Sequence, residues 1–405
     1  MTKYGRSPWI DRAPASRVPV YPKYKGHADV DVAIIGGGLT GCMAAYAFAA
    51  AGVGVVLLES DRIGQGTTSL ADGWISDDPG TRFADVEKVM GARAARSGWQ
   101  AWRRASLDFI ALVRRLNLKC ELEPHGLLSV ASNPDDVLLL KKEQEVRKDA
   151  GLETSIVNAR SLIVEAGITA PAALRSKDGA TIDPYRATIG LAAAAEERGA
   201  RLFEHSSVSR TTFTRKIATV HTAEGTLKVR RVIVATGTPT VLFKSLRRHF
   251  WFKSSYAVLT ERVPAKIRQQ LGKRTMIVRD SAAPAHIIRW VDDDRILVVG
   301  ADGPTVPPKL RGKTVVQRTG QLMYELSTIY PEISGLQPGY GWEAPYALTA
   351  EGLPYLGPHR NFPFHLFAFG DASPSVTGAY LASRVFLRNF LDEVDASDVA
   401  FTFTR

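Results

Sequence analysis

The chain has 405 residues, a length that exceeds one compact core and favours two domains, either successive or intertwined. Hydrophobic residues make up 45% and charged residues 23%, and Cys42 and Cys120 form no disulfide or metal pattern, which indicates a globular protein of a reducing compartment without a metal site. No signal peptide or run of membrane-spanning length is visible, so a cytoplasmic protein is the simplest interpretation, although its net charge of +11 needs an explanation.

The stretch 30–59 follows an N-terminal arm (residues 1–28) that is expected to lie extended on the surface. A β-branched apolar run at 32–35 predicts a buried strand, and glycines in G-x-G-x-x-G spacing, an Ala-rich helix and a second strand come next. Such glycines allow a tight turn, close approach of a pyrophosphate and close packing of the helix, whose N-terminus favours an anion. A carboxylate that ends the second strand can accept both ribose hydroxyls. We predict a dinucleotide site, against the alternative of an ordinary glycine loop, at Gly36, Gly38, Leu39, Thr40, Gly41, Glu59 and Ser60.

A glycine- and hydroxyl-rich loop at 61–74 can wrap phosphate and ribityl groups, unless it is a plain surface loop. Helices are predicted at 91–117, 134–150 and 158–166, with a strand at 126–131. Residues 91–119 hold seven Lys or Arg and one acid. The simplest interpretation is a helix that packs by its aromatic stripe and leaves a solvated basic face, and contact with an anionic partner or membrane surface is the alternative. Nucleic-acid binding is not predicted, because the aromatic and basic residues lie on different faces.

The second half of the chain alternates between two patterns. A helix is expected from 181–185 to Arg198, and a buried strand at 229–234 ends in small residues that can lie close to a ligand. Strands at 254–260, 275–279, 285–291 and 295–300, with a helix at 313–329, predict an antiparallel sheet of a second domain. A last strand at 366–371 precedes a helix that starts near Val376, capped by Ser373 or Ser375.

Four segments in this order resemble the D-amino-acid oxidase-like FAD-dependent oxidoreductases, the family that contains glycine oxidase and sarcosine oxidase. They are 36–59, 64–73, 235–237 and 342–391, and the last includes 349–358, which is similar to T-x-D-G-L-P-x-I-G with Glu351 in place of Asp. The resemblance implies an α/β fold: a Rossmann-like FAD-binding domain of the glutathione reductase type, with a second α+β substrate domain on an antiparallel sheet. The expected boundaries are 29–88, 170–245 and 343–395 for the FAD domain, and 89–169 and 246–342 for the substrate domain.

The resemblance also implies roles for single residues. The three glycines would hold the pyrophosphate, Glu59 the adenosine ribose and the Val208 backbone the adenine, and non-covalent FAD is expected. The turn at 370–377 would approach the ribityl chain and pyrimidine ring, and the following helix N-terminus would stabilise negative charge at flavin N1–C2=O. Asp371–Ser375 replaces the family's glycine-rich turn, and Pro374 removes one N–H donor. The other residues expected at the cofactor are Thr67, Thr68, Gly73, Ala235, Thr236, Gly237, Gly370, Asp371, Ser375, Val376 and Thr377.

A single dinucleotide fingerprint implies that the substrate itself reduces the flavin. The expected reaction is hydride transfer from the carbon of a neutral amine to flavin N5, followed by hydrolysis of the imine. Arg289 is the candidate anchor for a substrate carboxylate, unless it is a surface residue, and His286 would face the other way. Glu343 stands near the position where the resemblance to D-amino-acid oxidases implies a carboxylate-binding arginine, so the expected substrate is a small amine as well as an amino acid. The other pocket candidates, each with a core role as alternative, are Tyr256, Trp342, Trp251 and Tyr346.

By the family resemblance, Val298, two residues before Gly300, corresponds to the position where sarcosine oxidases carry a lysine that helps oxygen react. An apolar residue there predicts a dehydrogenase rather than an oxidase, with a quinone, a carrier or oxygen as electron acceptor. One alternative is an FAD-binding protein without turnover that acts in assembly or electron transfer. Another is an NAD-dependent dehydrogenase, which explains neither Thr67 and Thr68 nor the C-terminal section.

Overall fold

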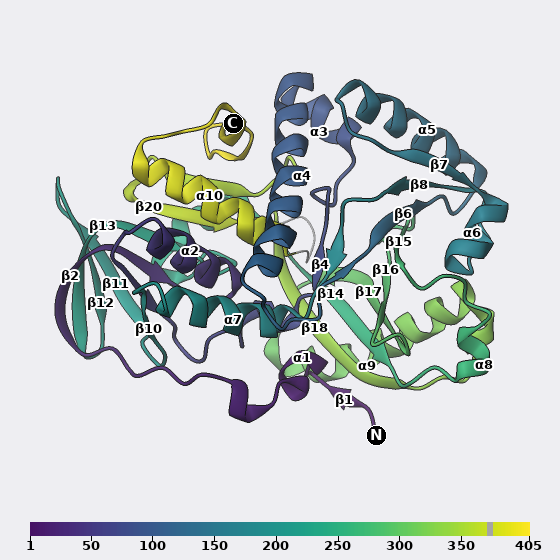
Figure 1. Ribbon diagram of the computed structural model, residues 1–405, viewed down its shortest axis with the longest axis horizontal. Coiled ribbons are helices and arrows are strands. Elements are labelled where there is room, and N and C mark those ends of the chain that lie inside the picture. Colours follow the sequence, from purple (N-terminus) through teal and green to yellow (C-terminus); the bar gives the residue numbers. More distant parts are fainter. Residues whose placement is uncertain (371–375) are drawn as a thin grey trace.

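A computed structural model of the chain describes residues 1–370 and 376–405 (Figure 1). Within these residues, an eight-stranded sheet and a nine-stranded sheet lie next to each other, and there is also a small three-stranded sheet. The mixed α/β architecture predicted from the sequence is confirmed.

The eight-stranded sheet, on the left of Figure 1, is built on four parallel strands in the order β10, β3, β2, β13. The strand β20 continues it, parallel to the second half of β13. The central strands are apolar because helices and the opposite core cover both faces. The strands are β2 (Gly26–Ile35), β3 (Val55–Leu58), β10 (Arg201–Phe203), β11 (Val208–Phe213), β12 (Ala218–Thr222), β13 (Gly225–Val234), β19 (Tyr355–His359) and β20 (Phe362–Phe369).

Three helices cover one face of this sheet: α2 (Leu39–Ala50), α7 (Pro184–Glu196) and α10 (Thr377–Leu391). The start of α7 is capped by the Asp183 side chain, which accepts a hydrogen bond from Arg186 N. The α2 N-cap is Gly38, which has no side chain to cap the helix, and Thr68 Oγ1 accepts a hydrogen bond from Leu39 N at 2.8 Å instead. The predicted cap serines of the last helix and Asp371 lie outside the described residues.

The nine-stranded sheet has the order β1, β18, β14, β17, β16, β15, β6, β8, β7, and most of its neighbours are antiparallel. The helix α9 (Pro308–Ile329) packs on one face, where the strands contribute a buried apolar core. The strands are β1 (Lys3–Tyr4), β6 (Gly126–Val130), β7 (Ser155–Asn158), β8 (Ala172–Ser176), β14 (Trp251–Thr260), β15 (Met276–Asp280), β16 (Ile287–Val291), β17 (Arg295–Pro304) and β18 (Pro338–Leu348).

The predicted basic helix is α4 (Ala92–Arg115), and it packs as the aromatic pattern indicated. Trp99, Trp102 and Phe109 are buried in the core that α4 shares with α10, whereas most of its arginines are exposed. None of the described helices is both long enough and apolar enough to cross a membrane. The other helices are α3 (Phe83–Met90), α5 (Pro134–Asp149), α6 (Ala159–Ala166), α8 (Ala265–Arg268) and the 3-10 segments η1 (Ala15–Arg17), η2 (Thr67–Leu70), η3 (Val241–His249), η4 (Pro331–Ile333) and η5 (Ala396–Phe401).

The N-terminal arm, which was expected to be extended, contains a short strand and a short helix. Its first strand β1 pairs in parallel with β18, and the short helix α1 (Pro8–Arg12) buries Trp9, which is 1% exposed. The small sheet consists of β4 (Trp74–Ile75), β9 (Ala180–Thr181) and β5 (Glu123–Pro124). The expected domain boundary after residue 342 falls inside β18, which stays in the nine-stranded sheet up to Leu348. We propose that each large sheet marks one domain.

Candidate active site

The glycine turn connects β2 to α2, and its geometry requires glycine. Gly36 has a φ of +107°, and a Cβ there would lie 2.5 Å from the backbone oxygen of Ala235. A Cβ on Gly41 would lie 1.9 Å from the backbone oxygen of Gly36. Neither contact can relax by a side-chain movement, because both partners are backbone atoms. The turn therefore brings strand, helix and the end of β13 as close together as a pyrophosphate cradle demands.

Glu59 lies where β3 ends and faces the same turn. Its Oε2 accepts a hydrogen bond from Gly37 N at 2.6 Å, and its Oε1 accepts from Asp61 N at 2.8 Å and from Ser60 Oγ at 3.0 Å. An ionised carboxylate has about four acceptor sites, so a site is left for a ribose hydroxyl. Ser206 N donates to the backbone oxygen of Glu59 at 2.7 Å, which brings the segment that leads into Val208 next to this end of the site.

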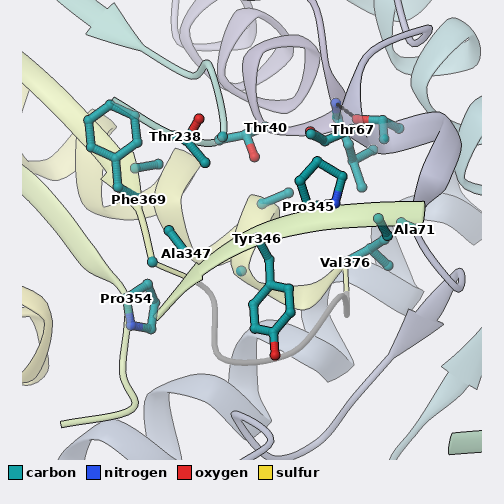
Figure 2. A pocket seen from close by; sticks show the side chains of 18 of the residues that line it. Thr40, Thr67, Ala71, Thr238, Pro345, Tyr346, Ala347, Pro354, Phe369 and Val376 are labelled. Carbon is teal, nitrogen blue, oxygen red and sulfur yellow. Dashed lines mark hydrogen bonds between the residues drawn. The ribbon is translucent and has the colours of Figure 1, made fainter. Parts of the chain in front are cut away.

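A cavity with about 900 Å³ of empty space, its open mouth included, lies between the glycine turn, η2, β18 and the start of α10. Figure 2 shows Thr40, Thr67 and Thr238 gathered on one side of β18, while the Tyr346 ring extends away from them. Seven of the residues predicted for the cofactor line this cavity: Leu39, Thr40, Thr67, Thr68, Gly237, Gly370 and Val376. Tyr346, predicted as a substrate residue, also lines the cavity. The lining residues that the sequence did not predict are Ala71, Thr238, Ala344, Pro345, Ala347, Pro354, Leu356, Ala368, Phe369, Gly378 and Ala379.

The remaining predicted cofactor residues lie around the cavity without lining it. Ala235 N donates to the backbone oxygen of Ile35 at 2.9 Å, and Thr236 Oγ1 donates to the backbone oxygen of Thr238 at 2.9 Å. Gly73 has a φ of +75° on the segment that follows Ala71. Thr377 is buried and donates to the backbone oxygen of Ser76 at 2.8 Å. Asp371 and Ser375 lie outside the described residues, as does Pro374.

Tyr346 is the one substrate candidate that lines the cavity. Its hydroxyl donates a hydrogen bond to the carboxylate of Asp302, at the end of β17. Burial raises the pKa of Tyr346, and the negative charge of Asp302 raises it further. Trp342 stands four residues earlier on β18, is buried, and donates from Nε1 to the backbone oxygen of Leu70 at 3.0 Å. It supports the wall of the cavity without lining it. Asp302 was not predicted, because no motif marks it in the sequence.

Three candidates lie on the opposite face of the nine-stranded sheet, against α9. The ring of Tyr256 packs under the guanidinium of Arg318, at 5.8 Å. His286 is held between Asp280, at 2.6 Å from Nδ1, and Glu325 of α9, at 2.9 Å from Nε2.

Val298 lies on this face as well, and its side chain is fully buried in the core beneath α9. It faces away from the cavity, so a lysine there would be a buried charge. The predicted position of Val298 at the flavin is therefore wrong. Trp251 is 58% exposed at the start of β14 and also lies outside the cavity.

Arg289 is buried but does not reach the cavity as a carboxylate anchor. Its Nε and Nη2 both donate to the backbone oxygen of Asp72, at 2.8 and 2.6 Å, and its Nη1 donates to that of Trp290 at 3.4 Å. Burial lowers the pKa of Arg289 to about 10, although Asp72 nearby opposes this effect. Burial also raises the pKa of Asp72 to about 7. The guanidinium therefore donates to backbone oxygens beside the cavity and does not point a donor at a substrate carboxylate.

The donor set at this site fits FAD. The glycine turn, the N-terminus of α2 and Glu59 suit the ADP half, which needs backbone N–H groups for phosphate and a carboxylate for ribose. The adjoining cavity suits the flavin half, because it combines apolar walls with threonine hydroxyls. Among the described residues that line it, none carries a positive charge.

Comparisons with known proteins agree with this fit. A gamma-glutamylputrescine oxidoreductase from Escherichia coli strain K12 is 26% identical over 373 residues, which cover 90% of this chain and 85% of that protein. A glycine oxidase from Bacillus licheniformis is 24% identical, covering 84% of this chain and 87% of that protein. The crystal structure of glycine oxidase from Geobacillus kaustophilus superposes with a TM-score of 0.74 at 19% identity, over 93% of this chain and 99% of that one.

The structural likeness shows the same fold, and the family match carries the identification. Residues 31–387 match the family model described as DAO, FAD dependent oxidoreductase. That span includes the glycine turn, most of both large sheets and most of α10, and leaves out the N-terminal arm with β1. The chain therefore belongs to the DAO family of FAD dependent oxidoreductases, whose cofactor FAD it binds.

Proposed function

We propose that this protein oxidises the C–N bond of a small amine or amino acid, with FAD as the immediate electron acceptor. The observation that carries the proposal is the cavity between the glycine turn and β18, which is lined by threonine hydroxyls suited to the cofactor and by Tyr346 on the other side of β18. The names of two relatives support the substrate class, since one acts on gamma-glutamylputrescine and the other on glycine. The bound flavin supplies a hydride acceptor.

The protein's own residues would bind and orient the amine and keep water away. Ala344, Pro345, Ala347 and Phe369 give the cavity apolar walls, which favour the neutral form of an amine. Tyr346 donates its O–H hydrogen bond to Asp302, so the lone pairs of its oxygen can accept an N–H of the substrate. The imine that leaves the site would be hydrolysed by water.

We further propose that the reduced enzyme passes its electrons to an acceptor other than oxygen, which makes it a dehydrogenase. A positive charge near a flavin favours the oxygen reaction by stabilising developing negative charge. The described lining residues supply no such charge, and Val298 lies in the core beneath α9. The test is to reduce the enzyme with dithionite and mix it with air or with a quinone in a stopped-flow instrument. Reoxidation that is as fast in air as with the quinone would make the protein an oxidase.

The reaction itself is tested by anaerobic titration of the purified flavoprotein with a panel of amines and amino acids. Bleaching of the flavin absorbance by at least one of them is the expected result. A flavin that dithionite reduces but no member of the panel bleaches would contradict turnover, and would favour a role in assembly or electron transfer. We also propose a cytoplasmic location, with which the free thiols of Cys42 and Cys120 are compatible.

A further inference from the structure

The segment from Leu70 to Ser76 leads away from the cavity, and side chains from distant parts of the protein bind its successive backbone oxygens. Ala71 lines the cavity itself, and η2 precedes it. The first three bonds run from Trp342 Nε1 to Leu70 O at 3.0 Å, from Trp9 Nε1 to Ala71 O at 2.9 Å, and from Arg289 Nε and Nη2 to Asp72 O at 2.8 and 2.6 Å.

The same segment is tied to the start of α10 further along. Val376, another lining residue, donates its N–H to the backbone oxygen of Trp74 at 2.9 Å. Thr377 Oγ1 donates to Ser76 O at 2.8 Å. These bonds fix the position of Ala71 relative to the other walls of the cavity, because a chain segment held at several consecutive carbonyls cannot shift without breaking them.

We propose that Trp9 and Arg289 are positioning residues of the flavin site: they hold the Ala71–Asp72 wall through its backbone oxygens. The two side chains act together, since the guanidinium carbon of Arg289 lies 5.3 Å from the centre of the Trp9 ring. An aromatic face over a buried guanidinium offsets part of its lost hydration. Trp9 belongs to the N-terminal arm, which lies outside the family match. The arm thus contributes a hydrogen bond to a wall of the site that the family domain forms.

Simple packing does not account for these contacts. Trp99 is buried to the same extent as Trp9, at 1% exposure, and its Nε1 has no hydrogen-bond partner in the part of the chain that the structure describes. A buried indole in this protein therefore does not always donate a hydrogen bond to a backbone oxygen. Arg289 likewise places two donors on one carbonyl, an arrangement in which a lysine could place only one.

The experiment compares Trp9→Phe with Trp99→Phe as a matched control, because both lose an indole of equal burial and only the first loses a hydrogen bond. The readouts are the FAD dissociation constant of the apoprotein, measured by fluorescence quenching, and the visible circular dichroism of the bound flavin. We expect Trp9→Phe to raise the dissociation constant roughly fivefold, the scale of one hydrogen bond, and to change the flavin dichroism. Trp99→Phe should lower the unfolding temperature and leave both flavin readouts unchanged.

Arg289→Lys and Arg289→Met test the second positioning residue. The lysine variant keeps the charge and one donor, so its flavin readouts should fall between those of the wild type and the methionine variant. If Arg289→Met fails to fold, the comparison of Trp9→Phe with Trp99→Phe still tests whether the Ala71–Asp72 wall is held through its backbone oxygens. Equal effects of Trp9→Phe and Trp99→Phe on FAD affinity and dichroism would overturn the proposal. None of these measurements requires a substrate, so the result is independent of whether an amine is oxidised.

Discussion

His286 provides a test of the face assignment in the nine-stranded sheet. Its imidazole joins Asp280 to Glu325 of α9, and these hydrogen bonds and charges raise its pKa from 6.5 to about 9, against the effect of burial. A histidine with a raised folded-state pKa stabilises the protein fully below pH 6.5, and the stabilisation disappears as the pH rises through 9. The free energy of unfolding should therefore contain a contribution from His286 at acidic pH that is absent at alkaline pH.

The full rise in pKa corresponds to about 3 kcal/mol, at ~1.4 kcal/mol per pKa unit. The side chain of Glu325 is 29% exposed and partly screened by solvent, so we expect about 2 kcal/mol. The assay is urea unfolding of the wild type and of His286→Gln at pH 5.5 and pH 10. The difference between the two proteins should be about 2 kcal/mol larger at pH 5.5, because other titrating groups are common to both.

Flavin absorbance and FAD affinity should be the same in both proteins, since His286 faces α9 and not the cavity. An equal difference in stability at both pH values would refute the reasoning from the ion pairs. A changed flavin spectrum in His286→Gln would refute the assignment of His286 to the α9 face.

Three further predictions concern the site. Glu59→Gln should weaken FAD binding by about 1–3 kcal/mol, the scale of a lost charge-assisted hydrogen bond, and an unchanged dissociation constant would mean that the ribose is held elsewhere. Acid precipitation should leave the yellow colour in the supernatant, because neither cysteine lines the cavity, and colour in the pellet would indicate covalent FAD. Tyr346→Phe should lower kcat/KM for the amine about tenfold with FAD affinity unchanged, and equal kcat/KM values would show that Tyr346 does not touch the substrate.

The sequence by itself determined the features that depend on neighbouring residues. The β2–turn–α2–β3 unit could be predicted because glycine spacing, a buried apolar run and a terminal acid lie within about thirty residues of one another. The long helices were predicted well for the same reason: 91–117, 134–150 and 158–166 became α4, α5 and α6 with shifts of one or two residues at their ends. Family resemblance added the FAD cofactor, which no local pattern specifies.

The tertiary structure decided which way the strand side chains point and what distant residues they meet. Alternation along a strand says that His286 and Arg289 lie on opposite faces, but it does not say which face receives α9 and which faces the cavity. The register shift of β14 at Ser254/Tyr256 adds to this ambiguity. The partner of Arg289 is the backbone of Asp72, 217 residues earlier, and a backbone oxygen leaves no mark in the sequence. Trp9 donates to the backbone oxygen of Ala71, in the same wall of the cavity. The sequence does not predict this contact, because the arm carries no motif and only the fold places it next to the 70–76 segment.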